Sequence, residues 1–583
     1  MLPASRIYRF GDFSLESGER LLRRKGLEVI LRPKAFETLL YLVERHGHLV
    51  AKGELLDRVW PDASVSESVL NHCISEIRQA LQDDPYNPHY LKTIPRVGFK
   101  FVNEAEEVIP TMQETKPATK APAASAIAVL PFANISADPE NEFLCDGLSE
   151  ELINGLSKVP TLRVVAHSSS FAFKGRDIDA REIGRQLNVT AILEGSVRKA
   201  GSHLRISAQL IDAVEGYHLW SEQYDRPMED VFAIQDAISA AILNKLKIEL
   251  LSDRRNPFSK RPTGDMEAYQ LYLKGRSFWH RRYEGFLQKA LACFEQAIQK
   301  DPHFALAFTG LADTYGALGV WGWDPPKEVF PNAVALVRKA LEIDETLAEA
   351  HASQGFIHTF YDWNWVSAEG KFQQAIDLNP GCATTHLWNG HYLSIVGRFD
   401  EAIAEVRIAQ DLDPMSPVVG ANFGWTLFLA SEKDRAVNEL QRVLELDPHN
   451  AIARFYLGYP YAQSGKFKEA IEMFQEAMRS TGGMPWSAES VGWVYGLTGK
   501  RSKAKAILHE SESRMQRKQY VPSSAVALVH LGLGEDDAVF EWLERAVDER
   551  DAFMPWVKHF PPLGRLHSDP RFHALLSRMN MEP

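Results

Sequence analysis

An alanine recurs at a nearly constant spacing through the second half of the chain, and this regularity constrains the fold more than any other feature. The eight positions are Ala290, Ala333, Ala368, Ala402, Ala436, Ala470, Ala504 and Ala538. The successive spacings are 43, 35, 34, 34, 34, 34 and 34 residues. A fixed period of roughly 20 to 50 residues indicates stacked structural units, each of which buries its apolar face only against its neighbours.

The residues around each alanine recur as well. In one copy the pattern is Leu457, Gly458, Tyr461, Gly465, Phe467, Ala470, Phe474 and Ala477. Other copies close with Asp-Pro, as at Asp413-Pro414, because proline has no N–H to donate and ends a helix. The pattern resembles the tetratricopeptide repeat, in eight copies over about residues 266–550. The resemblance implies an all-α superhelix with a concave groove over residues 266–583, ending in an amphipathic capping helix.

Four ring-bearing side chains fall at one equivalent position of the repeats, where the resemblance implies that they face the groove. The column and its neighbours are His391, Trp425, Tyr459 and Trp493, with Phe360, Tyr361, Leu387, Phe428 and Phe455. Such a surface suits an amphipathic helix, an extended peptide or a ring-stacking small molecule. The same rings would equally fill space between repeats, because aromatic residues at helical spacing are usually core. We expect an unidentified protein or small-molecule signal here, with core packing as the alternative.

The segment before the repeats divides into a linker and a second domain. Residues 104–125 are rich in Pro, Ala, Thr and charge, which predicts a flexible linker. Residues 126–255 alternate apolar runs with helical periods, which predicts a central α/β domain. Phrases such as Ile127 to Phe132 and Leu193 to Arg198 resemble the TolB-like amino-terminal domain, which precedes tetratricopeptide arrays in bacterial chains. The resemblance implies a fold class and no particular chemistry.

Residues 1–103 show the order of elements of a winged helix, an α+β fold. Short alternating strands come first, then amphipathic helices starting near Pro33, Lys52 and Ser66, then a hairpin, YLKTIPRVGFKFV. The phrases LRPKAF, VWP, ISEIR and TIPRVGF resemble the OmpR/PhoB-type effector domain, most closely its ToxR/CadC one-component branch. The resemblance covers about residues 7–102 and implies binding to double-stranded DNA.

In such a domain the third helix enters the major groove, which is wide enough for one helix. The polar face of that helix and the hairpin supply the candidate DNA-binding residues, Ser68, Asn71, His72, Ser75, Arg78, Gln79, Lys92, Thr93, Arg96 and Lys100. Asn and Gln suit adenine, and Arg suits guanine or phosphate. Arg96 stands at the wing-tip position of the family and is the candidate for insertion into the minor groove. The loop from Trp60 to Val65 is implied to face RNA polymerase.

The charge distribution confines DNA binding to this first domain. Residues 1–103 carry 15 Lys and Arg against 13 Asp and Glu, whereas the whole chain has a net charge of −12. A net charge of only +2 predicts weak binding by a single domain, because phosphate contacts dominate affinity. We therefore expect paired half-sites and a homodimer.

Enzyme and metal motifs are missing from the sequence. It contains no GxxxxGK[ST] loop, no GxSxG elbow and no GxGxxG turn after a strand, so no catalytic residue is assigned. The acidic pair Glu150-Glu151 fits the first turn of a helix, where it complements the helix dipole. The four cysteines form no CxxC, so neither a metal nor another cofactor is expected. No run of about 18 apolar residues and no signal peptide is found, so we expect no membrane contact and a cytoplasmic location.

The sequence thus predicts a multidomain, non-enzymatic, one-component transcription regulator. Its winged helix binds DNA under the control of a signal received by the TolB-like and tetratricopeptide module. One alternative is a protein-interaction scaffold whose winged helix is a docking module; such a protein would show no salt-dependent DNA binding. Another is a subunit of a signalling enzyme, indicated only by the other chains in which such middle domains occur.

Overall fold

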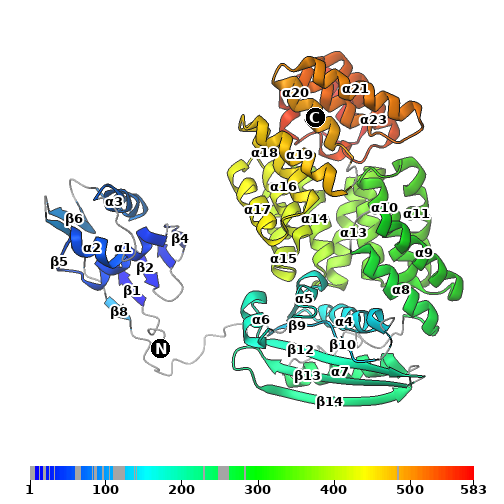
Figure 1. Cartoon of the computed structure of the whole chain (residues 1–583), viewed down its shortest axis with the longest axis horizontal. Helices are drawn as coiled ribbons and strands as arrows, with labels where there is room; N and C mark the ends of the chain where they lie inside the picture. Colours follow the sequence, from blue (N-terminus) through cyan, green and yellow to red (C-terminus); the bar gives the residue numbers. More distant parts are fainter. Residues whose placement is uncertain are drawn as a thin grey trace. The chain divides into compact units, whose positions relative to one another are not determined.

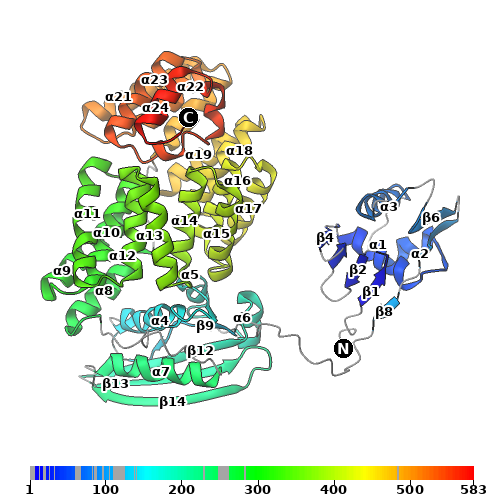
Figure 2. The ribbon, with the colours of Figure 1, turned by 180° about the vertical axis from the view of Figure 1, so that it is seen from behind.

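The computed structural model divides the chain into two compact units, Met1–Lys120 and Ala121–Pro583 (Figures 1 and 2). It describes residues 7–582 except 12, 17–20, 25–26, 30, 32, 60–66, 82, 85–87, 95–96, 104–105, 109–124, 137, 139–140, 177, 202, 228–229, 247–261, 281–283 and 482–484.

The N-terminal unit is a winged helix, as the sequence predicts. Its helices are α1 (Pro33–Glu44), α2 (Lys52–Val59) and α3 (Glu67–Leu81). An antiparallel sheet of order β4-β3-β2-β1-β8 comprises β1 (Ile7–Phe10), β2 (Phe13–Glu16), β3 (Leu21–Arg24), β4 (Leu27–Val29) and β8 (Glu106–Val108). A second sheet of order β5-β7-β6 comprises β5 (Leu49–Ala51), β6 (Leu91–Ile94) and β7 (Gly98–Phe101). One core joins both sheets to the helices, with Phe10, Leu39, Ile74 and Phe101 fully buried or nearly so.

Strand β8 corrects the predicted start of the linker. Glu106–Val108 falls within residues 104–125, yet it pairs antiparallel with β1, opposite Ile7 to Arg9. An unpaired edge strand leaves a row of N–H and C=O groups without partners, and β8 satisfies those of β1. Of the expected linker, residues 104–105 and 109–124 lie outside the described residues.

The hairpin of β6 and β7 is held against the end of α3 by a buried carboxylate. Asp83 accepts hydrogen bonds from the backbone N–H groups of His89, Tyr90 and Leu91 at 2.6, 3.1 and 2.7 Å. Strand β7 also approaches β5 so closely that a side chain at Gly98 would collide with the backbone of Val50. These contacts fix where the hairpin lies relative to the third helix.

We expect Asp83→Ala to destabilise the N-terminal unit by about 2 kcal/mol, because it leaves buried N–H groups without an acceptor. Urea unfolding of residues 1–120 measures this change. Asp57→Ala, which removes an exposed carboxylate of α2, is the control and should leave the midpoint unchanged. Equal midpoints for both variants and the unmodified unit would contradict the assignment.

The middle domain is a mixed sheet of order β11-β9-β12-β13-β14, with β10 paired to β12. Its strands are β9 (Ser125–Val129), β10 (Ala133–Asn134), β11 (Leu162–Val164), β12 (Ala191–Ala200), β13 (His203–Asp212) and β14 (His218–Pro227). Its helices are α4 (Glu142–Ser157), α5 (His167–Phe171), α6 (Ala180–Leu187) and α7 (Val231–Lys245). Alternate residues of β9 enter different cores: Ile127 and Val129 pack with α4 and α7, whereas Ala126 and Ala128 pack with α6. The predicted α/β class is confirmed.

Between Met266 and Glu549 the described residues form eight antiparallel helix pairs, which confirms the all-α repeat array. The pairs are α8 (Met266–Trp279) with α9 (Glu284–Lys300), α10 (Ala305–Val320) with α11 (Pro326–Ile343), α12 (Ala348–Ile357) with α13 (Trp365–Leu378), α14 (Ala383–Ile395) with α15 (Phe399–Leu412), α16 (Pro417–Leu429) with α17 (Lys433–Leu446), α18 (Ala451–Gln463) with α19 (Phe467–Thr481), α20 (Ser487–Leu497) with α21 (Arg501–Gln516), and α22 (Ser523–Leu533) with α23 (Asp536–Glu549). The tail adds α24 (Pro570–Arg578), which packs on α23.

The recurring alanine lies in the second helix of each pair and is fully buried in the first seven. The last copy shifts by one residue. Val539 rather than Ala538 is buried there, followed by Leu543 and Ala546 at the spacing that Phe474 and Ala477 keep from Ala470. Among the described residues, no helix is long and apolar enough to cross a membrane.

The middle domain packs directly on the first repeat, with α4 between the sheet and the repeats (Figure 1). Glu150 lies in the third turn of α4, not in the first turn of a helix as the sequence predicts. It is buried and binds Arg276 at 3.0 Å and His280 at 3.2 Å, both at the end of α8. Burial alone raises the pKa of a carboxyl, but Arg276 and His280 bring that of Glu150 well below its usual value. One hydrophobic cluster of the second unit therefore runs from the sheet into the repeats.

Candidate functional site

The outer face of α3 presents a stripe of polar side chains. Asn71, Ser75 and Gln79 are exposed and spaced four residues apart, so they lie along one side of the helix. The opposite side buries Leu70, Ile74, Ile77 and Leu81 in the core. Val69, the neighbour of Leu70, is 39% exposed although it is apolar. The stripe offers amide and hydroxyl groups, which are donors and acceptors of the kind that pair with base edges.

Arg78 connects this helix to the hairpin. Its Nη2 donates to the carbonyl oxygen of Leu91 at 2.9 Å and to the hydroxyl of Thr93 at 2.7 Å, both on β6. Two of the predicted DNA-binding residues, Arg78 and Thr93, are therefore bound to each other. This contact sets the position of the hairpin relative to α3, a positioning role that the sequence pattern does not reveal.

The hairpin brings two lysines together. Lys92 on β6 is directly opposite Lys100 on β7 in the antiparallel register. Lys92 is exposed and Lys100 half-buried. Like charges at directly opposed positions of a sheet repel and cost free energy. An anion bound beside the hairpin removes that cost, so the pair is suited to a phosphate group.

Some of the predicted DNA-facing residues cannot be placed. Arg96 and the loop from Trp60 to Val65 lie outside the described residues, as do the side chains of Ser68 and His72. Their roles stay predictions.

The aromatic column of the repeats exists as a stack of neighbouring rings. The ring centroids of Trp425 and Tyr459 are 5.8 Å apart, and those of Tyr459 and Trp493 are 5.7 Å apart. These three side chains are at most 3% exposed. The column is therefore a buried structure, not an open surface.

The C-terminal tail covers the column, which the sequence does not predict. We call residues 551–566 the closing segment; it contains two 3-10 turns, Met554–Trp556 and Pro561–Leu566. The ring of Phe560 lies 5.2 Å from that of Tyr459 and 5.9 Å from that of Trp425. The ring of Trp556 lies 5.5 Å from that of His391. The expected peptide groove is occupied by the chain itself.

The tail returns to an early repeat. After α24, the carbonyl oxygen of Met579 accepts a hydrogen bond from Trp365 Nε1 at 3.1 Å, and the amide of Asn580 donates to the carbonyl oxygen of Trp363 at 3.2 Å. The tail thus runs from the last repeat to the third repeat. The tail thereby links the third repeat to the last repeat.

We expect Phe560→Ala to destabilise the second unit by about 3 kcal/mol, because it empties a fully buried site among aromatic rings. Tryptophan emission should shift to longer wavelength as the rings beneath become hydrated. Thermal unfolding and fluorescence measure both effects. Leu497→Ala, at a side chain that is 45% exposed, is the control; equal effects of the two changes would argue that the closing segment does not cover the column.

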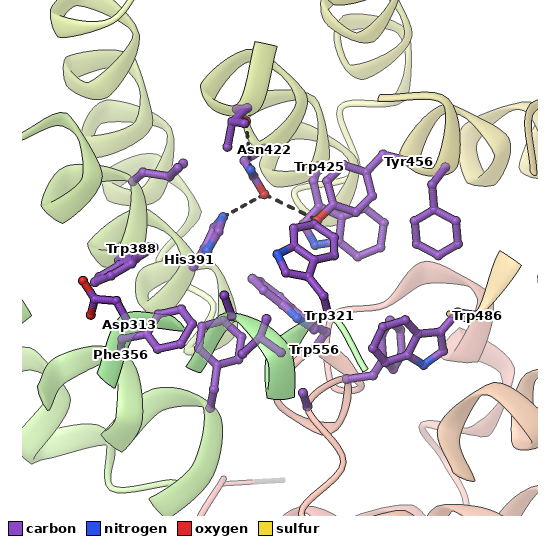
Figure 3. Close-up of a pocket in the computed structure, with 18 residues that line it drawn as sticks. Asp313, Trp321, Phe356, Trp388, His391, Asn422, Trp425, Tyr456, Trp486 and Trp556 are labelled. Carbon is purple, nitrogen blue, oxygen red and sulfur yellow. Dashed lines mark hydrogen bonds between the residues drawn. The ribbon is translucent and has the colours of Figure 1, made fainter. Parts of the chain in front are cut away.

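A cavity of about 90 Å³ remains between the repeats and the closing segment (Figure 3). Five of the nine predicted groove residues line it: Phe360, Leu387, His391, Trp425 and Phe455. Of the other four, Tyr459 borders a smaller cavity of about 20 Å³, Phe428 and Trp493 lie in the core, and Tyr361 stacks on Phe330. The repeat spacing alone does not predict all the other lining residues. Trp321 lies in the connection between α10 and α11, and Trp556 lies in the closing segment, so neither occupies a repeat position.

Two polar residues of the cavity form a fixed pair. His391 Nε2 lies 3.0 Å from Asn422 Oδ1, and the Asn422 amide donates to the carbonyl oxygen of Val418 at 2.8 Å. Because Asn422 Oδ1 can only accept, the ring carries its proton on Nε2. Burial lowers the pKa of His391 to about 4, so the ring is neutral at pH 7.

This depressed pKa predicts a pH-dependent stability. In the unfolded chain His391 takes up a proton below its ordinary pKa of 6.5, whereas in the folded chain it does so only below about pH 4. The folded protein therefore becomes less stable as the pH falls from about 6.5 to about 4. We expect the stability difference between the unmodified protein and His391→Gln to shrink by about 2 kcal/mol from pH 7 to pH 5. Denaturant unfolding at both pH values measures it. The control is His509→Gln, at an exposed histidine, for which the stability difference from the unmodified protein should be the same at pH 7 and pH 5. A stability difference for His391→Gln that does not change between the two pH values would contradict the prediction.

A second cluster lies between α4, α5 and α8. Ligand atoms of Glu150, His167 and His280 lie within 4.8 Å of one another, as in a metal site. However, the two imidazole rings stack in parallel at 4.0 Å, so their in-plane lone pairs do not converge on one point. Arg276 already binds the carboxylate at 3.0 Å. This arrangement fits a structural joint better than a metal centre.

Comparisons with known proteins match each domain separately. Residues 26–101 match the family model of the C-terminal domain of transcriptional regulatory proteins. Residues 123–241 match the second domain of HilA/YgeH-like transcriptional regulators, and residues 422–485 match a tetratricopeptide repeat. These matches confirm the OmpR/PhoB-type winged helix and the repeats. The middle domain matches the HilA-like model, while its resemblance to TolB stays a prediction.

Individual relatives cover different parts of the chain. The transcriptional regulator HilA of Salmonella typhimurium is 26% identical over 426 residues, which cover 72% of this chain and 73% of that protein. The putative adenylate cyclase 3 of Rhizobium meliloti is 36% identical over 296 residues, but the match spans 49% of this chain and only 43% of the cyclase. The solved DNA-binding domain of Escherichia coli CadC is 26% identical and covers 18% of this chain and 96% of that domain, with a TM-score of 0.17.

Proposed function

We propose that this chain is a one-component, non-enzymatic transcription regulator that binds specific DNA sequences with its winged helix. The observation that carries the proposal is the opposed pair Lys92 and Lys100 on the hairpin to which Arg78 of α3 is bonded. The lysines supply phosphate contacts, and Asn71, Ser75 and Gln79 supply base contacts. Arg78 keeps the two surfaces in a fixed relation through its bonds to β6. The matched family model of residues 26–101 supports this assignment.

The second unit is proposed to receive the signal. Its concave face is filled by the closing segment, which argues against a peptide-binding scaffold and favours a small molecule in the remaining cavity. The regulator acts in the cytoplasm, where DNA is accessible. It binds paired half-sites as a homodimer and contacts RNA polymerase through the loop from Trp60 to Val65.

Selection of bound sequences from random duplex DNA by the full chain tests the proposal. We expect a repeated motif to be enriched, and Asn71→Ala with Gln79→Ala to relax the base preference at particular positions of it. Arg78→Ala is unsuitable as the principal variant, because it also releases the hairpin. Failure of the well-folded protein to enrich any motif would leave the docking-module alternative.

The salt dependence of binding separates the role of the lysines from that of α3. Lys92→Ala with Lys100→Ala should weaken binding to all sequences and reduce the slope of log affinity against log salt by about 2. The control is Lys466→Ala with Lys500→Ala, which removes the same charge from exposed positions of the repeats. An unchanged slope for the hairpin variant would refute the phosphate role of the two lysines.

A further inference from the structure

One edge of the mixed sheet in the second unit has no strand beside it among the described residues. The sheet ends there with β14, which pairs with β13 on its inner side and is the outermost strand in Figures 1 and 2. From Trp220 to Arg226 this pairing is regular, and the segment contains neither proline nor glycine. An edge strand directs a row of N–H and C=O groups away from the sheet, where another strand can pair with them.

The edge formed by β11 is different, because the repeats cover it. Strand β11 is only three residues long. Its Arg163 donates to the carbonyl oxygen of Asp411 at 2.8 Å, and the N–H of Ala166, just after the strand, donates to the carbonyl oxygen of Leu412 at 2.7 Å. Both acceptors belong to the repeats. Strand β14, by contrast, lies on the side of the sheet away from the repeats (Figure 1).

Two charged side chains of β14 have no opposite charge at the opposed position of β13. Glu222 lies opposite an alanine, and Arg226 lies opposite a leucine. Both charged side chains are exposed. Asp225, in contrast, lies opposite Arg205 and binds it at 2.6 Å. Complementary charges for Glu222 and Arg226 can therefore come from a strand on the outer side of β14.

We propose that β14 pairs antiparallel with β14 of a second copy of this chain, about a twofold axis at Tyr224. A twofold axis at the middle residue exchanges the two ends of the segment. Glu222 of each copy then lies opposite Arg226 of the other, and two pairs of opposite charge form. Such pairs stabilise neighbouring strands, and the backbone hydrogen bonds continue the sheet from one copy into the next.

The charges also discriminate between registers of this pairing. With the axis at Glu222, the two carboxylates would face each other and repel. With the axis at Gln223, Glu222 would lie opposite Tyr224 and Arg226 opposite Trp220, so no ion pair would form. The axis at Tyr224 is the one of these three that places both charges opposite a complementary charge.

The contact area sets the expected strength of the dimer. One pair of strands buries less surface than the roughly 1,600 Å² of a standard interface, so the free protein should dimerise with a dissociation constant in the micromolar range. Two winged helices on one DNA molecule would strengthen the contact, because it then becomes intramolecular. As the basis of paired half-sites, this inference rests on the proposed function; as a contact between two copies, it stands independently.

Sedimentation velocity of the full chain over a range of concentrations, without DNA, tests the inference. We expect the unmodified protein to convert reversibly from monomer to dimer as its concentration rises. Glu222→Arg and Arg226→Glu should each weaken dimerisation about tenfold, because like charges then oppose each other at two positions.

An equimolar mixture of these two variants tests the register itself. In a mixed dimer the two substituted side chains oppose each other, as do the two unsubstituted ones, and both pairs are of opposite charge. We expect the mixture to dimerise about as tightly as the unmodified protein. Tyr224 donates a hydrogen bond to Glu222 at 3.1 Å within the strand. Its loss in Glu222→Arg is the same alone and in the mixture, so it cannot produce this recovery.

The control is Glu215→Arg, which makes the same change of charge at an exposed residue between β13 and β14 and should leave dimerisation unchanged. An unmodified protein that stays monomeric up to millimolar concentration would overturn the inference. So would equal dimerisation of Glu222→Arg and the control, or a mixture that dimerises no more tightly than the separate variants. Because no DNA is present, a failure to bind DNA cannot produce any of these outcomes.

Discussion

A stack of helical repeats buries each repeat against the next, but it leaves apolar surface at its first end and along its concave side, and both must be covered. This chain supplies both covers itself. At the first end, α4 packs on α8 and buries Glu150, whose charge is balanced by Arg276 and His280. Along the concave side, the closing segment places Trp556 and Phe560 over the aromatic column. The middle domain, the repeats and the tail therefore form one body.

These covers limit the space that stays open along the repeats. An open tetratricopeptide groove accepts a helix or an extended peptide, whereas a covered one leaves only a small cavity. The cavity is also electrostatically coupled to the contact between α4 and α8, because Arg276, which binds Glu150, interacts with Asp313 of the cavity wall as well.

In the N-terminal unit the constraint is of another kind. Helix α3 and the hairpin share one apolar core, and polar bonds also fix how the hairpin lies against the end of that helix. Arg78 and Asp83 supply these bonds, the first to β6 and the second to the backbone that leads into it. Arg78, which is a candidate for DNA contact on sequence grounds, is thereby also a structural residue.

The sequence by itself determined the elements and their order. The eight helix pairs follow from the alanine spacing, and the strands and helices of the winged helix follow from local periodicity, because each helix or strand is set by residues near one another in the chain. Only the tertiary structure decided that β8 joins the first sheet, that Val539 replaces Ala538, that Arg78 is bound to Thr93 and that the tail covers the groove. The physical reason is distance along the chain. Trp425 and Phe560 are far apart in the sequence and come into contact only in the folded chain. No spacing, period or motif in the sequence predicts a contact over such a separation.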